Sequence, residues 1–288
     1  MAIELRTPGV DDLDEAADAL RAWQHDSAPM QLHPGDLGWY RRFGVERAAA
    51  AVRTWRRDGR VLAVGLLDGP TLLRLTLAPD AHQDVELARE LLADVGEPGR
   101  GVLPEGPADI EAPEGALLRD LLTEAGWRPG EAWTPLIRDL TEPVPPPAVR
   151  IEVAGPERAD AYAGVLRAAF DRSTFTAQRW RAMAVGSLYE EARCLLAYDD
   201  GGAAVAVVTV WSAGPGRPGL LEPMGVHRDH RVRGHGAAIC AAAAAALREL
   251  GASSALVSTP SANTAAVATY KAAGYRPMPQ VRDRSRQA

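Results

Sequence analysis

The sequence lacks the features that direct a chain to a membrane or to a nucleic acid. It has no run of about 20 apolar residues, and its start has no basic segment followed by an apolar one, so we expect no membrane span and no secretion signal. The formal net charge is −6 and like charges form no blocks, whereas binding of phosphate-rich partners needs a basic surface. We therefore expect a cytoplasmic protein that binds neither nucleic acid nor membrane.

Metal-binding patterns are also missing. Only two cysteines occur, Cys194 and Cys240, and neither has a neighbouring cysteine at ligand spacing. His227, His230 and His235 lie close together, but no carboxylate or cysteine stands with them at a recognised metal spacing. We expect no metal. The cysteines are predicted to lie in the core, and the histidines either relay a proton or contact ligand and solvent.

A proline-rich segment divides the chain. With 288 residues, 47% hydrophobic and 24% charged, the chain has a globular composition and room for two domains. The stretch "TEPVPPPAV" has four prolines in nine residues and no hydrophobic period, as in an extended linker. These features predict domains at 1–140 and 150–288, joined by a linker at 141–149.

The two halves resemble each other. The "IEL" at Ile3 recurs as "IEV" at Ile151, and the "AGWRP" at Ala125 recurs as "AGYRP" at Ala273, both with an offset of 148. A repeat of this length indicates a duplicated domain. We therefore expect both halves to have the same order of helices and strands.

Hydrophobic patterns in the second half predict a mixed α/β sheet flanked by helices. Two β-rich runs, "RCLLAY" and "AAVAVVTVW", are joined by the hairpin signal "DDGG". After them, strands and helices alternate, which places loops at the carboxyl ends of strands. The other expected strands are 150–153, "GLLEPMGV", "SSALVST" and short final strands, and the expected helices are 157–170, 236–250 and 263–273.

A glycine-rich loop follows the strand "GLLEPMGV". The stretch "VHRDHRVRGHG" places Arg231, Gly234 and Gly236 in the pattern R-x-x-G-x-G, where a strand meets a helix. Peptide N–H groups without side chains can approach a phosphate closely, and the helix start adds partial positive charge. The same glycines would also suit a tight turn.

A second motif lies downstream, in "NTAAVATYKAAGY". Asn263 and Tyr270 are seven residues apart, about two helical turns, so they share one helix face, and Gly274 suits the helix end. Together the two motifs resemble those of the GNAT superfamily of acyl-CoA-dependent N-acetyltransferases.

This resemblance implies that acetyl-CoA, the acyl-donor substrate, lies between "GLLEPMGV" and "SSALVST". Main-chain groups near Met224 and Val226 would bond the pantetheine arm, and the loop amides would hold the pyrophosphate. The predicted donor-binding residues are Met224, Val226, Arg231, Val232, Arg233, Gly234, His235, Gly236, Ala237 and Asn263.

The resemblance also implies that Tyr270 donates a proton to the departing thiolate. A base must take up the ammonium proton, and Glu222 is the first candidate because Glu222, Met224 and Val226 alternate onto one face of their strand. Alternatively, Tyr270 packs in the core and Glu222 pairs with an arginine.

The first half lacks this chemistry. Where the glycine loop should lie it has His82, Val85 and Leu87, while Asp84 and Glu86 add negative charge that would repel an anion. The chain thus resembles tandem GNAT proteins in which one half is degenerate.

The predicted function is transfer of an acetyl group from acetyl-CoA to a primary amine of a small molecule or peptide, by direct attack. The alternative is a non-catalytic acyl-CoA sensor or partner-binding module, which would not need Tyr270 as an acid. Two stacked halves imitate the dimers that are common in the superfamily, so a monomer is favoured over a homodimer.

Overall fold

The computed structural model describes residues 2–287, which form two compact units. The second unit contains Thr134–Pro279 together with Pro34–Gly44 from the first half of the chain. The first unit contains the rest, including the segment that begins at Gln280. Each unit therefore contains one segment from the other half of the chain. The division of the sequence into two domains at the linker 141–149 remains a prediction.

The first unit is a mixed α/β structure. Its strands follow the order β1-β2-β3-β4-β5-β13, and β13 also pairs with the start of β6. Neighbouring strands are antiparallel except for β4 and β5, which are parallel. The elements are β1 (Glu4–Arg6), α1 (Leu13–Trp23), α3 (Val45–Ala51), β2 (Val52–Arg57), β3 (Arg60–Leu67), β4 (Leu72–Leu77), α4 (Val85–Gly96), β5 (Ala108–Glu111), α5 (Leu117–Glu124), the start of β6 (Arg128–Asp139) and β13 (Val281–Arg286).

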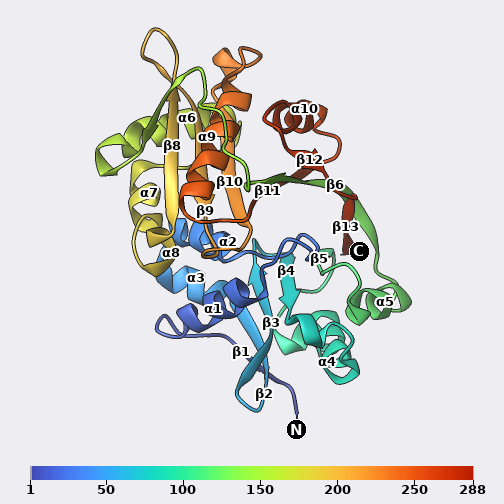
Figure 1. Ribbon diagram of the computed structural model, residues 1–288. Helices are drawn as coiled ribbons and strands as arrows, with labels where there is room; N and C mark the ends of the chain where they lie inside the picture. The colour runs from blue at the N-terminus through green and yellow to red at the C-terminus, as the bar shows by residue number, and fades with distance from the viewer. Residues whose placement is uncertain (1, 288) are drawn as a thin grey trace. The chain divides into compact units, whose positions relative to one another are not determined.

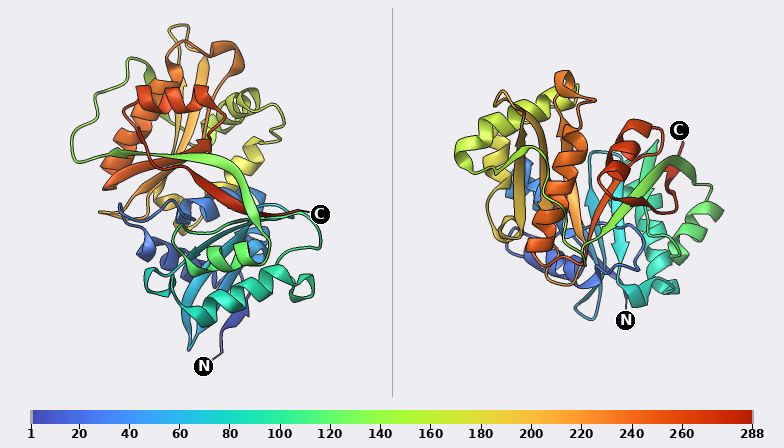
Figure 2. Two further views of the ribbon diagram at one scale, coloured as in Figure 1. Left: turned by 90° about the vertical axis from the view of Figure 1, so that its right-hand side faces the viewer. Right: turned by 45° about the horizontal axis from the view of Figure 1, so that its top comes forward.

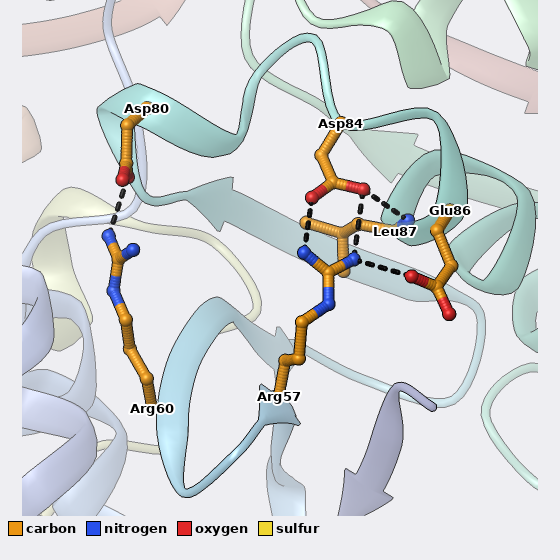
Figure 3. A network of polar contacts seen from close by, with 6 residues as sticks. All are labelled: Arg57, Arg60, Asp80, Asp84, Glu86 and Leu87. Carbon is orange, nitrogen blue, oxygen red and sulfur yellow. Dashed lines mark hydrogen bonds and ion pairs between the residues drawn. The ribbon is translucent and has the colours of Figure 1, made fainter. Parts of the chain in front are cut away.

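The start of α4 in this unit is occupied by the protein's own carboxylate (Figure 3). Asp84 is the N-cap, and its Oδ1 accepts a hydrogen bond of 2.9 Å from the amide of Leu87. Arg57 donates to both Asp84 oxygens, at 2.6 and 3.1 Å, and also reaches Glu86 at 3.0 Å. The Arg57 hydrogen bonds, followed by that from the Leu87 amide, lower the pKa of Asp84 to about 2. The partial positive charge at the start of α4 is therefore already offset by a carboxylate of the protein itself.

We expect Asp84→Ala to lower the free energy of unfolding by about 1–2 kcal/mol at pH 7, since both the helix cap and the Arg57 pair are lost. The folded pKa lies below the ordinary value, so the stabilisation is complete above about pH 4 and is lost as the pH falls towards 2. Urea denaturation of both proteins at several pH values measures the difference.

Asp80→Ala is the matched control for this variant. Asp80 pairs with Arg60 on the same surface, but the two side chains are 63% and 56% exposed, and exposed pairs contribute little. We expect a change below about 0.5 kcal/mol. Equal losses for the two variants would contradict a special role of Asp84 at the helix start.

The second unit has the same order of elements, as the repeat predicted. Its strands follow the order β11-β10-β9-β8-β7, with the end of β6 beside β11 and paired with β12. The elements are α2 (Pro34–Tyr40), the 3-10 turn η1 (Arg41–Phe43), β7 (Arg150–Val153), α6 (Ala159–Ala169), α7 (Ala177–Met183), α8 (Ser187–Glu190), β8 (Ala192–Tyr198), β9 (Ala204–Trp211), β10 (Gly219–Val226), the 3-10 turn η5 (Arg228–His230), α9 (His235–Glu249), β11 (Ser254–Pro260), α10 (Thr264–Ala272) and β12 (Arg276–Pro277).

Helices cover both faces of this sheet (Figures 1 and 2). The side chains of Met224 and Val226 join the core beneath α9 and α10. Gly225, which lies between them, faces the opposite way, because a Cβ there would come within 2.7 Å of Ala169 at the end of α6. The start of α9 and the end of α6 therefore lie on opposite faces of the sheet, at the last residues of β10.

The alanine-rich helix α9 packs very closely on the sheet. A Cβ on Gly219 of β10 would overlap a methyl group of Leu247 and lie 3.0 Å from the Trp211 carbonyl, so any larger residue here would push α9 or its side chains away. Alanines such as Ala243 and Ala244 are fully buried against the strands. Small side chains on one helix face permit this approach.

The predicted α/β class and the predicted elements of the second half are confirmed, with boundaries shifted by only a few residues. The sequence patterns did not predict α7 and α8, which lie between α6 and β8. Within residues 2–287, no helix combines the length and the apolar character needed to cross a bilayer.

Candidate active site

The R-x-x-G-x-G segment lies between the carboxyl end of β10 and the start of α9, where the sequence placed it. Gly234 is the N-cap of α9 in the left-handed conformation, with φ of 84°, and it has no side chain to cap the helix. The amides of His235, Gly236 and Ala237 belong to the first turn and have no carbonyl within the helix to bond. This helix start therefore presents several N–H donors to a ligand.

Two features of the backbone show how tightly this loop is built. A Cβ on Gly236 would lie 2.7 Å from the Thr269 methyl group on α10 and 3.4 Å from Val226. Val232 adopts φ of 60°, which is unusual for a β-branched residue, and its side chain is fully exposed. Strained backbone is often retained at ligand-binding sites.

The arginine of the motif has a structural partner. The Arg231 guanidinium donates a 2.7 Å hydrogen bond to the carbonyl of Ala169, and Arg228 donates one of 2.9 Å to Ala168. Both carbonyls lie at the end of α6, where helix carbonyls need outside donors. The sequence analysis placed Arg231 among the donor-binding residues, and here its side chain anchors the loop to α6. The exposed Arg233 is the other basic side chain of the loop.

The three histidines form a cluster beside the loop. The rings of His227 and His230 are 5.3 Å apart, and those of His230 and His235 are 6.3 Å apart. His227 accepts a hydrogen bond from the Asp229 amide, and His230 lies 3.5 Å from Asp199. Across residues 2–287, no three histidine, cysteine or acidic side chains are arranged to hold a metal ion.

Strands β10 and β11 separate near the loop. Their parallel pairing joins Gly219 and Leu220 to Ala255 and Leu256. Among the described residues, no pairing of these two strands continues beyond those positions. On its other edge β10 remains paired with β9 as far as Val226. The edge of residues 221–226 that faces β11 thus offers main-chain groups to a ligand, at the place where the pantetheine arm was expected.

Glu222 lies at an irregularity of β10. The pairing with β9 shifts between Leu221 and Met224, which marks a β-bulge. Met224 and Val226 still share a face, but strict alternation does not extend through a bulge to Glu222. The sequence argument for the orientation of Glu222 therefore fails, although the residue remains near the site. Its carbonyl accepts a 2.6 Å hydrogen bond from the Trp211 indole.

Tyr270 lies in the core cluster beneath α9 and is only 5% exposed. Burial raises the pKa of its hydroxyl well above the ordinary value, and the nearby Cys240 and Glu222 raise it further. The hydroxyl therefore keeps its proton at neutral pH. Because Glu222 acts on Tyr270 electrostatically, the two predicted catalytic side chains lie in one neighbourhood.

Asn263 has a local structural role. It is the N-cap of α10, and its Oδ1 accepts a 3.1 Å hydrogen bond from the Ala266 amide. This occupies its carbonyl oxygen, while its side-chain NH2 group keeps two donors.

The sequence reading did not assign α2 to this site. A Cβ on Gly38 would lie 2.4 Å from the Trp211 ring, so α2 packs directly on the tryptophan that bonds Glu222. The glycine in "PGDLGWY" is the only local signal of this close approach, and nothing in the sequence indicated its partner.

Comparison with known proteins identifies the class of this domain. Residues 158–275 match the model of the acetyltransferase (GNAT) family. This part of the chain is therefore a GNAT domain, the catalytic domain of acyl-CoA-dependent acyltransferases. Among curated proteins, none matches the sequence.

The chain as a whole has the fold of tandem GNAT proteins. A tandem GNAT protein from the clavulanic acid biosynthesis pathway is 18% identical, with a TM-score of 0.64 over 99% of this chain and 98% of that one. A GCN5-related N-acetyltransferase from Sphaerobacter thermophilus is 19% identical, with a TM-score of 0.60 over 99% and 95%. Saccharomyces cerevisiae N-myristoyltransferase is 11% identical, with a TM-score of 0.61 over 99% and 78%.

Proposed function

We propose that this protein transfers an acetyl group from acetyl-CoA to a primary amine of a small molecule or peptide, with the second unit as the catalytic one. The observation that carries the proposal is the position of Tyr270 and Glu222 beside the unpaired edge of β10 and the uncapped start of α9. A donor with a long arm and a pyrophosphate suits these two neighbouring features.

The donor-binding roles follow from the main chain of the loop. The amides of His235, Gly236 and Ala237 would hold the pyrophosphate, because they point out of the helix start and lack partners within the helix. Arg231 would keep the loop in this shape through Ala169. In the first unit, Asp84 accepts from the Leu87 amide and places a negative charge at the start of α4, where it would repel a phosphate. We therefore propose one donor molecule per chain. From the sequence features described above, we also propose that the enzyme is cytoplasmic and monomeric.

The reaction removes two protons from the amine nitrogen and gives one to the thiolate. Glu222 would take a proton from the ammonium group, directly or through water, so that the neutral amine can attack the thioester carbonyl. The tetrahedral intermediate then loses the second proton of its nitrogen and collapses with loss of the thiolate, which Tyr270 would protonate. The nitrogen proton, passed through water, would restore the tyrosine hydroxyl. Burial keeps this hydroxyl protonated at neutral pH, so it is available as a donor when the thiolate departs. No covalent intermediate with the enzyme is required.

A CoA-release assay tests the proposal, with acetyl-, propionyl- and succinyl-CoA and a panel of amines. We expect acetyl-CoA and at least one amine to give equal amounts of CoA and acylated product. Glu222→Gln should slow this reaction by about 10²–10⁴ at pH values where the amine is mostly protonated, and by less as the pH approaches the amine pKa.

Two outcomes would contradict parts of this proposal. Tight binding of acetyl-CoA without CoA release for any amine would favour the non-catalytic acyl-CoA sensor. A pH–rate profile of Glu222→Gln with the same shape and height as that of the wild type would exclude Glu222 as the base. The affinity for acetyl-CoA serves as the control that the variant is correctly folded.

A further inference from the structure

A basic cluster stands on the side of the second unit formed by η1 and α7, which contact each other. Its members are Arg41 and Arg42 of η1 and Arg179 of α7. The only acidic residue of α2, η1 and α7 is Asp36, which is buried. The neighbouring helices α8 and α3 add Glu190 and Glu46, so the three arginines still outnumber the two exposed acids of these helices, and this side is a candidate for anion recognition.

Two of the three guanidinium groups have local partners. Arg42 lies over the rings of Trp39 and Phe43, at 4.2 and 4.3 Å, and donates a 2.9 Å hydrogen bond to the Trp39 carbonyl. Arg179 donates to the hydroxyl of Thr174 at 2.6 Å and also lies over Phe43. These two arginines are held in place by the protein itself.

Arg41 differs from them. Its Nε is buried and has no hydrogen-bond partner within residues 2–287, and its guanidinium lies against Gly186, where an added Cβ would be 2.8 Å from Nη2. Arg56 and Arg57 also have a buried Nε, but each forms an ion pair with a carboxylate. Across the same described residues Arg41 has no such pair. The buried Nε is out of reach of a ligand, but the positive charge of this guanidinium is not balanced by a carboxylate of the described residues, which leaves it open to a carboxylate from outside the protein.

The neighbours of Arg41 connect it to the catalytic residues. It follows Gly38 by three residues, and α2 presses Gly38 onto the Trp211 ring. Trp211 in turn donates to the Glu222 carbonyl at 2.6 Å. Helix α2 contacts β9, β10 and α8, and lies beside them in Figure 1. Arg41 therefore lies one helical turn along the chain from the glycine that packs on Trp211, the residue that bonds the proposed base.

We infer that Arg41 binds a carboxylate carried by the acceptor, so that the preferred substrate is an amine that also bears an acid group. A guanidinium presents paired N–H donors that match the two oxygens of a carboxylate. The amine of the same molecule would lie at Glu222. This inference rests on the proposed acetyl transfer and names the class of its acceptor.

The test compares amino acids with their primary amides, which keep the amine and lose the negative charge. For the wild type we expect kcat/KM to be at least about 10-fold higher for the acid of each pair. Arg41→Met should lower kcat/KM for the acid by about 10–100-fold, with a loss on the amide at least 10 times smaller. Arg41→Lys should recover only part of the preference, because it loses the paired donors.

Arg181→Met is the matched control, because this exposed arginine of α7 lies outside the basic cluster. It should leave kcat/KM for both members of each pair unchanged. Acetyl-CoA affinity and melting temperature should be the same in all variants, which separates acceptor recognition from folding and donor binding. Equal losses on acid and amide in Arg41→Met, or a wild-type preference for amides, would overturn the inference.

A direct binding measurement separates this inference from the proposed reaction. If no amine releases CoA, the proposed function fails, and calorimetry of the same acid and amide pairs with the protein–CoA complex decides the role of Arg41. Tighter binding of the acid that is lost in Arg41→Met would support an anion site. Binding of neither compound, or equal binding of both, would reject it.

Discussion

Replacing Gly236 with glutamate is expected to abolish acetyl-CoA binding, with at least a 100-fold loss of affinity. The new carboxylate would stand in the first turn of α9, where a pyrophosphate needs N–H donors and partial positive charge. Each charge-assisted hydrogen bond lost is worth about 1.5–3 kcal/mol. Isothermal titration calorimetry measures both affinity and stoichiometry.

Two controls separate charge from crowding in this experiment. Gly236→Ala adds only a Cβ, which must displace the Thr269 methyl group from its 2.7 Å approach, so it reports the steric part of the loss. Gly164→Glu introduces the same charge in the interior of α6, where a Cβ meets no atom within 4 Å, and should leave binding intact.

The stoichiometry of the same titration tests the first unit. The wild type should bind one molecule of acetyl-CoA per chain, and Gly236→Glu should bind none. Residual binding of one molecule in the variant would show that the start of α4 accepts a donor despite Asp84. Unchanged affinity in a folded Gly236→Glu protein would end the assignment of this loop to the pyrophosphate.

Tyr270→Phe is expected to lower kcat by about 10²–10⁴ and to change acetyl-CoA affinity by no more than about threefold. Phenylalanine fills almost the same volume in this buried site and removes only the hydroxyl. Burial and the neighbouring Cys240 and Glu222 keep that hydroxyl protonated at neutral pH. Its loss should therefore affect the departure of the thiolate and leave donor binding largely intact. Steady-state kinetics with calorimetry checks both parts.

Tyr275→Phe is the matched control for this variant. The two rings are 6.0 Å apart, and Tyr275 is also buried, but its hydroxyl donates to the Cys240 carbonyl at 3.4 Å. We expect a loss of stability of about 1 kcal/mol and little change in kcat. Equal kcat for wild type and Tyr270→Phe would show that Tyr270 is a packing residue.

Interactions between residues that are close in sequence made much of the second unit predictable. The β-rich runs on either side of "DDGG" form the hairpin β8–β9, and the alanine-rich run forms α9. The glycines Gly234 and Gly236 mark the start of α9, because one needs a left-handed backbone and the other has no space for a Cβ. Periodicity, turns and helix starts depend on neighbouring residues, so a single sequence contains enough information for them.

The orientation of individual side chains was less predictable. Alternation placed Met224 and Val226 correctly but could not account for the bulge at Glu222, which depends on how β10 pairs with β9. The motif identified Arg231 correctly as part of the loop. Its partner, the Ala169 carbonyl, is 62 residues away in the chain, so no local pattern could indicate it.

The sequence by itself determined the strands and helices of the second half apart from α7 and α8, the position of the glycine-rich loop, and the lack of its glycines in the first half. Only the tertiary structure decided that Pro34–Gly44 joins the second unit and that the segment from Gln280 joins the first. It also decided that Arg41 lies against Gly186, where its Nε has no hydrogen-bond partner among residues 2–287. The physical reason is that local conformation follows from nearby residues, whereas these placements result from packing between segments more than 100 residues apart, which leaves no periodic trace in the chain.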